Sequence, residues 1–147
     1  MNSTQTAVAS THSVSTVVRG ADPSSIRRAR EAARAYAVGL VPAVDRTAGD
    51  SLVLVVSELV TNALRHGGGR YTMALSATDD VVTVEVSDPS PVPPRERAPD
   101  LNGGSGGFGW HMVRHLTTGL TVIRGPDAGK TIRAQVPRAP RSTPGTG

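Results

Sequence analysis

The chain has 147 residues, the length of a single domain, and it contains no cysteine, which excludes disulfides and thiolate chemistry. Its formal net charge is +4, and aromatic residues make up 3% of it, too few for a surface that stacks nucleic-acid bases. The longest apolar run, Leu52–Val56, is far shorter than the roughly 20 residues of a membrane span, and the first residues lack the pattern of a signal peptide. These features predict a cytoplasmic protein with neither a membrane nor a nucleic acid as its direct partner.

Both ends of the chain differ from its middle. Residues 1–12 are small and polar, and residues 138–147 contain Pro, Gly, Ser and Thr without any hydrophobic periodicity. Segments of this composition cannot bury enough apolar surface to fold. We therefore expect two disordered tails around one domain at residues 13–137.

The first half of this domain is predicted to be mainly helical. After a short strand at residues 14–18, Asp22 and Pro23 are typical of a helix start, and this helix should end before Pro42. A second helix is expected over residues 45–66, where apolar residues recur with the helical period and a run of three glycines follows.

The second half alternates in the way that strands do. Residues 71–77 and 81–87 predict a hairpin, and a long segment rich in proline and glycine follows at 88–107. A third helix at 108–118 and two closing strands at 120–124 and 131–136 complete the order. This order predicts an α+β fold, a two-layer α/β sandwich in which helices cover one face of a mostly antiparallel sheet.

Glu58 and Asn62 form the first candidate motif. Standing four residues apart in the second predicted helix, they should project from the same face. A carboxylate and a carboxamide together suit a site for Mg²⁺ and phosphate, although the solvated edge of an amphipathic helix would look the same.

Two further motifs follow. Asp88 ends a predicted strand, where it is either a turn residue or a buried acceptor for an amino group of a ligand. The glycine-rich segment 103–109 leads into the third helix, so that backbone N–H groups and the helix dipole could meet an anion. The alternative for this segment is a flexible linker.

Taken in order, these motifs resemble those of the GHKL (histidine-kinase-like) ATPases, and more narrowly the anti-sigma-factor serine/threonine kinase branch. The resemblance covers about residues 14–137 and includes Gly129-Lys130-Thr131 before the last strand. It implies the Bergerat ATP-binding fold, with ATP and Mg²⁺ as cofactors. It assigns Mg²⁺ binding to Asn62, the role of general base to Glu58, and recognition of the adenine amino group to Asp88. The nucleotide-binding set implied by the resemblance is completed by Gly107, Gly109, Lys130 and Thr131.

The resemblance also implies the function and the partners. We expect an ATP-binding regulator of transcription, a serine/threonine-protein kinase that phosphorylates an anti-sigma antagonist and binds a sigma factor, with a homodimer left open. The sequence departs from the family at Ser90, where a glycine is usual, and it has no basic residue at 105–108. These departures keep open a nucleotide-gated binding module without catalysis. A nucleic-acid-binding regulator has as its support only the arginines between Arg27 and Arg34.

Overall fold

The computed structural model describes residues 16–92, 107–125 and 127–139. Its elements follow one another in the predicted order, (β)ααββ–αββ. They are β1 (Thr16–Gly20), α2 (Ser24–Gly39), α3 (Arg46–His66), β2 (Tyr71–Ala77), β3 (Val81–Asp88), α4 (Gly107–Leu116), β4 (Gly119–Arg124) and β5 (Lys130–Pro137). The predicted tail at 1–12, all but the first two residues of the predicted tail at 138–147, and the segment 93–106 lie outside the described residues.

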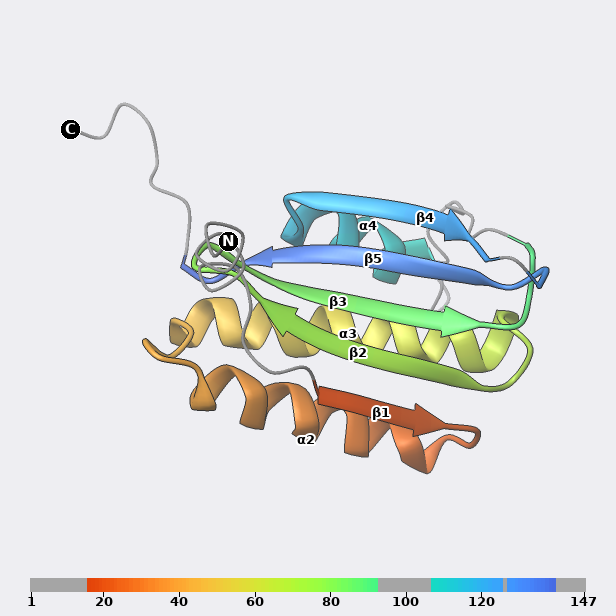
Figure 1. Ribbon diagram of the computed structural model, residues 1–147, viewed down its shortest axis with the longest axis horizontal. Coiled ribbons are helices and arrows are strands. Elements are labelled where there is room, and N and C mark those ends of the chain that lie inside the picture. Colours follow the sequence, from red (N-terminus) through yellow and green to blue (C-terminus); the bar gives the residue numbers. More distant parts are fainter. Residues whose placement is uncertain (1–15, 93–106, 126, 140–147) are drawn as a thin grey trace, which may run out of the picture.

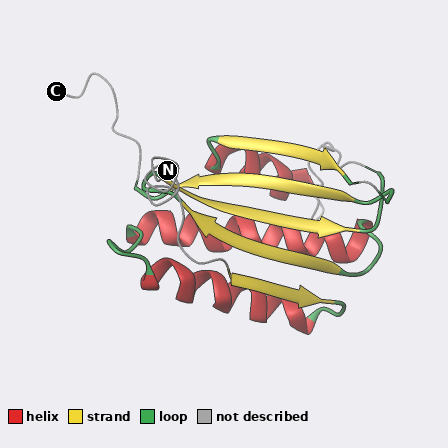
Figure 2. Ribbon diagram, in the orientation of Figure 1, coloured by secondary structure: helices red, strands yellow, loops and turns green. Residues whose placement is uncertain are grey.

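The five strands form one sheet in the order β1-β2-β3-β5-β4, in which every neighbouring pair is antiparallel. All three helices lie on the same side of this sheet (Figures 1 and 2). This arrangement confirms the predicted α+β, two-layer sandwich. A sheet of this kind buries one face and leaves the other open, which explains the alternating pattern of the strands.

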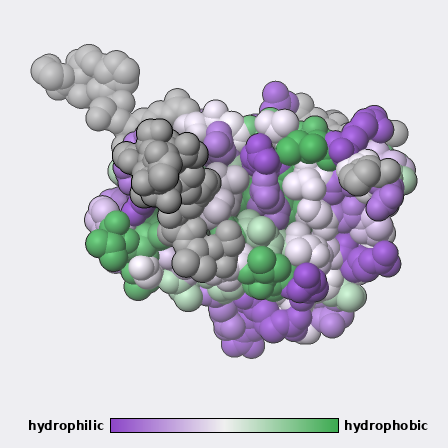
Figure 3. Space-filling view, in the orientation of Figure 1, coloured by the Kyte–Doolittle hydropathy of each residue, from purple (hydrophilic) through white to green (hydrophobic). Residues whose placement is uncertain are grey.

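The core lies between the sheet and the helices. Alternate side chains of β2 and β3 are buried, and α3 contributes eight buried residues from its apolar stripe. By length and composition alone α3 would be apolar enough to cross a membrane, yet here it is the central helix of the core. Hydrophilic and hydrophobic side chains are mixed on the open face of the sheet (Figure 3). Glu85 of β3 and Arg133 of β5 form a cross-strand ion pair there at 2.7 Å.

The predicted boundaries differ from the observed ones by one or two residues. Helix α2 begins at Ser24, so that Pro23 precedes the helix instead of opening it. Asp22 nevertheless accepts a hydrogen bond from the backbone N–H of Ser25 at 3.2 Å, which satisfies one donor of the first turn. Strand β1 ends at Gly20, two residues later than expected, and a β-carbon at this position would collide with Tyr71 and Ser25.

Candidate functional site

Strand β3 and helix α3 finish, and strand β5 starts, at the same end of the sandwich (Figure 1). Asp88 is the last residue of β3, and its side chain is almost completely buried. It points toward Gly67, the residue that caps the C-terminus of α3. A β-carbon at position 67 would overlap the Asp88 carboxylate and lie 2.6 Å from its Cγ. The missing side chain of Gly67 thus leaves room for this carboxylate beside the helix end.

Lys130 is the direct partner of Asp88. The register of β3 and β5 places the two residues opposite each other, so that both side chains lie on the helix-covered face. Lys130 Nζ lies 2.9 Å from Asp88 Oδ1, and both side chains are at most 5% exposed. The same ammonium group donates to the carbonyl oxygen of Ser90 at 3.3 Å, and the backbone N–H of Ser90 donates to Asp88 Oδ1 at 2.9 Å.

Thr131 lies on the other face of the sheet. Neighbouring residues of a strand point to opposite faces, and the hydroxyl group of Thr131 is 2.7 Å from that of Ser87. The structure therefore brings Lys130, but not Thr131, to Asp88. The roles that the resemblance gives Lys130 and Thr131 in nucleotide binding remain predictions.

Glu58 and Gly109 come together at the other end of the candidate site. Glu58 is half-buried on α3, and its carboxylate lies against the first turns of α4, so that a β-carbon on Gly109 would overlap it. Asn62 is also half-buried and stands one turn further along α3, on the same face as Glu58. Among the described residues, none forms an ion pair with Glu58. Gly107 is the first residue of α4, one position before the predicted start of this helix.

Helix α3 sets the spacing of the whole site. At the rise of an α-helix, Asn62 is about 7.5 Å and Glu58 about 13.5 Å from Gly67 along the helix axis. The buried carboxylate of Asp88 is thus at one end of this span, and Glu58 with the start of α4 is at the other. This span is comparable to the length of an extended nucleoside triphosphate.

The residues present fit Mg·ATP. Gly67 and Gly109 keep side-chain atoms out of the two places where carboxylates approach the helix ends, and Asn62 offers the oxygen ligand that Mg²⁺ prefers. Within the described ranges, no three His, Cys, Asp or Glu residues are close enough to form a metal cage of their own. Mg²⁺ would therefore be held by Asn62 together with the phosphates, as is usual for this cation.

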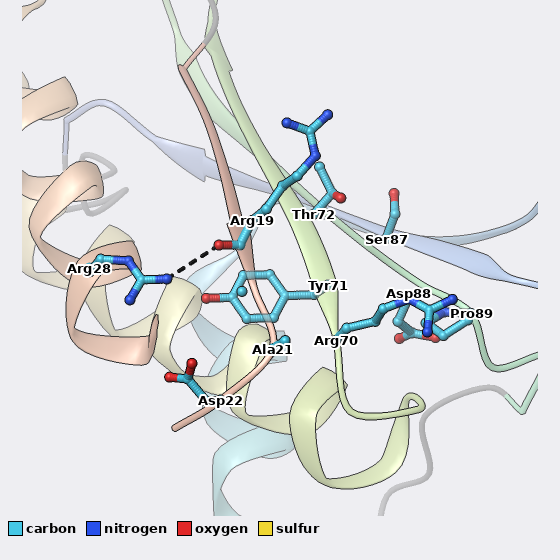
Figure 4. A pocket seen from close by; sticks show the side chains of 11 residues that line it. Arg19, Ala21, Asp22, Arg28, Arg70, Tyr71, Thr72, Ser87, Asp88 and Pro89 are labelled. Atoms are coloured by element: carbon cyan, nitrogen blue, oxygen red, sulfur yellow. Dashed lines mark hydrogen bonds between the residues drawn. The ribbon is translucent and has the colours of Figure 1, made fainter. Parts of the chain in front are cut away.

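A cavity of about 670 Å³ lies beside Asp88, at the ends of β1, β2 and β3 (Figure 4). Tyr71 is one of the residues that line it, and Arg28 donates to the carbonyl oxygen of Arg19 at 3.4 Å. Asp22 also lines it, and the Ser24 hydroxyl, followed by backbone N–H groups and Arg28, lowers the pKa of the Asp22 carboxyl. Neither Glu58 nor Asn62 lines this cavity, so it is distinct from the α3–α4 side of the candidate site.

Sequence reasoning missed two contributors to the site. From the sequence, Gly67 indicates only the end of a helix. The signal for its role in the site is its position directly after the helix that carries Glu58 and Asn62. The backbone of Ser90 was overlooked because nothing in its residue type announces an N–H group that binds Asp88. Such backbone roles depend on the path of the chain after β3.

The comparisons with known proteins agree with this geometry. Residues 20–136 match the histidine kinase-like ATPase domain, and the chain belongs to this family. Membership implies ATP binding. No curated protein sequence matches the chain.

Two solved structures have a similar fold. The first is that of the RsbU and RsbW domains of Rv1364c from Mycobacterium tuberculosis, with a TM-score of 0.61 and 20% identity. That match covers 89% of this chain, which spans only 35% of the mycobacterial one. The second is the SiaB–SiaC complex from Pseudomonas aeruginosa, with a TM-score of 0.56, 13% identity, and coverage of 91% of this chain and 95% of the other. Both similarities support the fold of the histidine kinase-like ATPase family.

Proposed function

We propose that the chain binds Mg·ATP between α3 and α4 and is a serine/threonine-protein kinase of the anti-sigma-factor type. The observation that carries the proposal is the arrangement along α3. Asp88 lies against the C-terminal end of this helix at Gly67, and Glu58 lies against α4 at Gly109. Gly67 and Glu58 are about 13.5 Å apart along the axis of α3, and Asn62 lies between them.

Each carboxylate has a chemistry that suits its place. Asp88 would accept a hydrogen bond from the adenine amino group in a site shielded from water, where such a bond selects strongly for its partner. Glu58 would take the proton from a substrate hydroxyl, the task of the base in phosphoryl transfer. The N–H groups at the start of α4 would face the phosphates. Mg²⁺, held beside Asn62, would neutralise the negative charge of the phosphates.

A protein substrate follows from the kinase proposal. One similar structure is a complex of SiaB with SiaC, and the other contains an RsbW domain beside RsbU. For this chain we propose an anti-sigma antagonist as phosphoryl acceptor and a sigma factor as binding partner. The protein would then regulate transcription in the cytoplasm without contacting nucleic acid.

Nucleotide binding is tested by thermal unfolding with and without Mg·ADP. A ligand at about 100 times its Kd stabilises a protein of this kind by about 2.7 kcal/mol, a Tm shift of several degrees. Asn62→Ala should lose most of this shift, and Thr61→Ala, the neighbouring residue on α3, should keep it. Absence of any shift in the wild type would contradict the proposal.

Phosphoryl transfer is tested separately, with labelled ATP and antagonist proteins encoded near this one. The wild type should label a Ser or Thr of one antagonist, and Glu58→Gln should transfer at least 100-fold more slowly. Binding of ADP and of the antagonist without any transfer would instead favour a nucleotide-gated binding module. The absence of a basic residue at 105–108 is the observation that supports this second function.

A further inference from the structure

The geometry points to Lys130 as a positioning residue for base recognition, which acts on the nucleotide only through Asp88. This inference rests on the proposed function, since it concerns how the same site selects adenine. The resemblance groups Lys130 with the residues that bind the nucleotide directly. In the structure its ammonium group is instead occupied by Asp88 Oδ1 and by the carbonyl oxygen of Ser90.

The two oxygens of Asp88 have different surroundings. Oδ1 accepts from Lys130 Nζ at 2.9 Å and from the Ser90 backbone N–H at 2.9 Å. Oδ2 faces Gly67, a residue without a side chain at the end of α3. With Oδ1 held by two donors, the carboxylate cannot rotate freely. Oδ2 is left as the acceptor for an amino group of the base.

The charge of Lys130 matters as much as its position. The Asp88 and Lys130 side chains are 2% and 5% exposed, so each charge has the other as its main compensation. A buried ion pair of this kind is a weak source of stability and is better suited to fixing one arrangement. An ionised carboxylate is only an acceptor, so it favours the amino group of adenine and disfavours a base that presents no donor there.

Lys130 is also far from the place expected for the phosphates. Its ammonium group contacts Asp88, which lies against Gly67, whereas Glu58 stands about 13.5 Å away along α3. A lysine that bound phosphate would have to leave both of its partners. Lys130 therefore differs in role from a lysine that binds phosphate directly.

Two ligands that differ only in the amino group test this inference. We would measure by calorimetry the Kd of ADP and of purine riboside 5′-diphosphate, which lacks the exocyclic amino group, in the presence of Mg²⁺. The wild type should bind ADP at least tenfold more tightly than the analogue. Lys130→Met should weaken the binding of ADP at least tenfold and the binding of the analogue less than threefold, so that the preference for ADP disappears. Lys130→Arg should restore at least part of the preference.

Arg133→Met is the matched control. Arg133 is a cation on the same strand, but it lies on the open face, where it pairs with Glu85. Its removal should leave the preference unchanged. If Lys130→Met does not fold, Lys130→Gln takes its place, because an amide can still donate to Oδ1 but carries no charge. It should reduce the preference at least threefold.

Four results would overturn the inference. If Lys130→Met weakened the binding of both diphosphates equally but did not weaken the binding of adenosine, Lys130 would bind phosphate. If Lys130→Met weakened the binding of both diphosphates and of adenosine equally, Lys130 would have a general structural role. An unchanged preference in Lys130→Met or Lys130→Gln would reject the inference and leave the proposed function standing. A wild type that binds neither diphosphate would reject both.

Discussion

The backbone of Gly109 lies directly against the carboxylate of Glu58, so that a β-carbon at position 109 would overlap Glu58 Oε1. This contact joins the first turns of α4 to the face of α3 that also carries Asn62. Because Glu58 is the proposed base and the start of α4 is the proposed phosphate contact, any atom added at position 109 would disturb both. The Glu58 side chain is flexible at its end, and it can move aside without unfolding the protein.

Gly109→Ala should therefore reduce function more than stability. We expect phosphoryl transfer to fall at least tenfold while the Kd for ADP changes less than the rate does, because the displaced group is the proposed base. Alanine favours a helix over glycine by about 1 kcal/mol, so the Tm should not fall markedly. Transfer assays and thermal unfolding measure the two effects. An unchanged transfer rate would contradict the prediction.

Gly67→Ala should weaken nucleotide binding. The new β-carbon would overlap the Asp88 carboxylate, which Lys130 and Ser90 hold in place, and would lie 2.8 Å from the carbonyl oxygen of Ala63. Neither neighbour can give way easily, so we expect a loss of about 1–3 kcal/mol of stability and at least tenfold weaker ADP binding. Urea unfolding and calorimetry measure these quantities.

Gly49→Ala is the control for both glycine variants. Gly49 lies within α3, and a β-carbon there meets nothing within 4 Å. The exchange should raise the free energy of unfolding by about 0.5–1 kcal/mol and leave ADP binding unchanged. A loss of stability in this variant would mean that the glycine contacts described above do not account for the effects at positions 67 and 109.

Two leucines of α3 offer a matched pair for the core. Leu59 is fully buried between the helix and the sheet, whereas Leu54 is 45% exposed on the same helix. Leu59→Ala should reduce the free energy of unfolding by about 2–5 kcal/mol, since it removes buried methyl groups and leaves a cavity. Leu54→Ala should change it by less than about 1 kcal/mol. If urea unfolding showed similar losses of free energy for Leu59→Ala and Leu54→Ala, the assigned orientation of α3 would be wrong.

The stabilisation provided by Asp22 should depend on pH. The hydroxyl group of Ser24, and then backbone N–H groups at Ser25 and Ser24, favour the ionised form and lower the pKa of the Asp22 carboxyl in the folded state. Its contribution is therefore present above the pKa of the unfolded chain, near pH 4, and disappears as the pH falls through the lower folded value. Asp22→Asn should be less stable than the wild type at pH 7, and this difference should shrink below about pH 4. A constant difference across pH would contradict the prediction.

Much of the fold was predictable from local patterns. The period of the apolar residues in α3 and the alternation in β2 and β3 identify the elements, because each pattern records which side chains face the core. The paired residues Glu58 and Asn62 could likewise be placed on one helix face from their spacing alone. Boundaries such as the start of α2 were less certain, because Asp22 and Pro23 both favour a helix start and only the chain path decides between them.

The sequence by itself determined the order of the elements, the buried face of each, and the residues Glu58, Asn62 and Asp88 as candidates. Only the tertiary structure decided which of the candidates meet. The register of β3 against β5 pairs Asp88 with Lys130 and turns Thr131 toward Ser87 on the other face. The packing of α4 against α3 brings Gly109 to Glu58, fifty-one positions earlier in the chain. Such contacts depend on the pairing of distant segments, which no local period encodes.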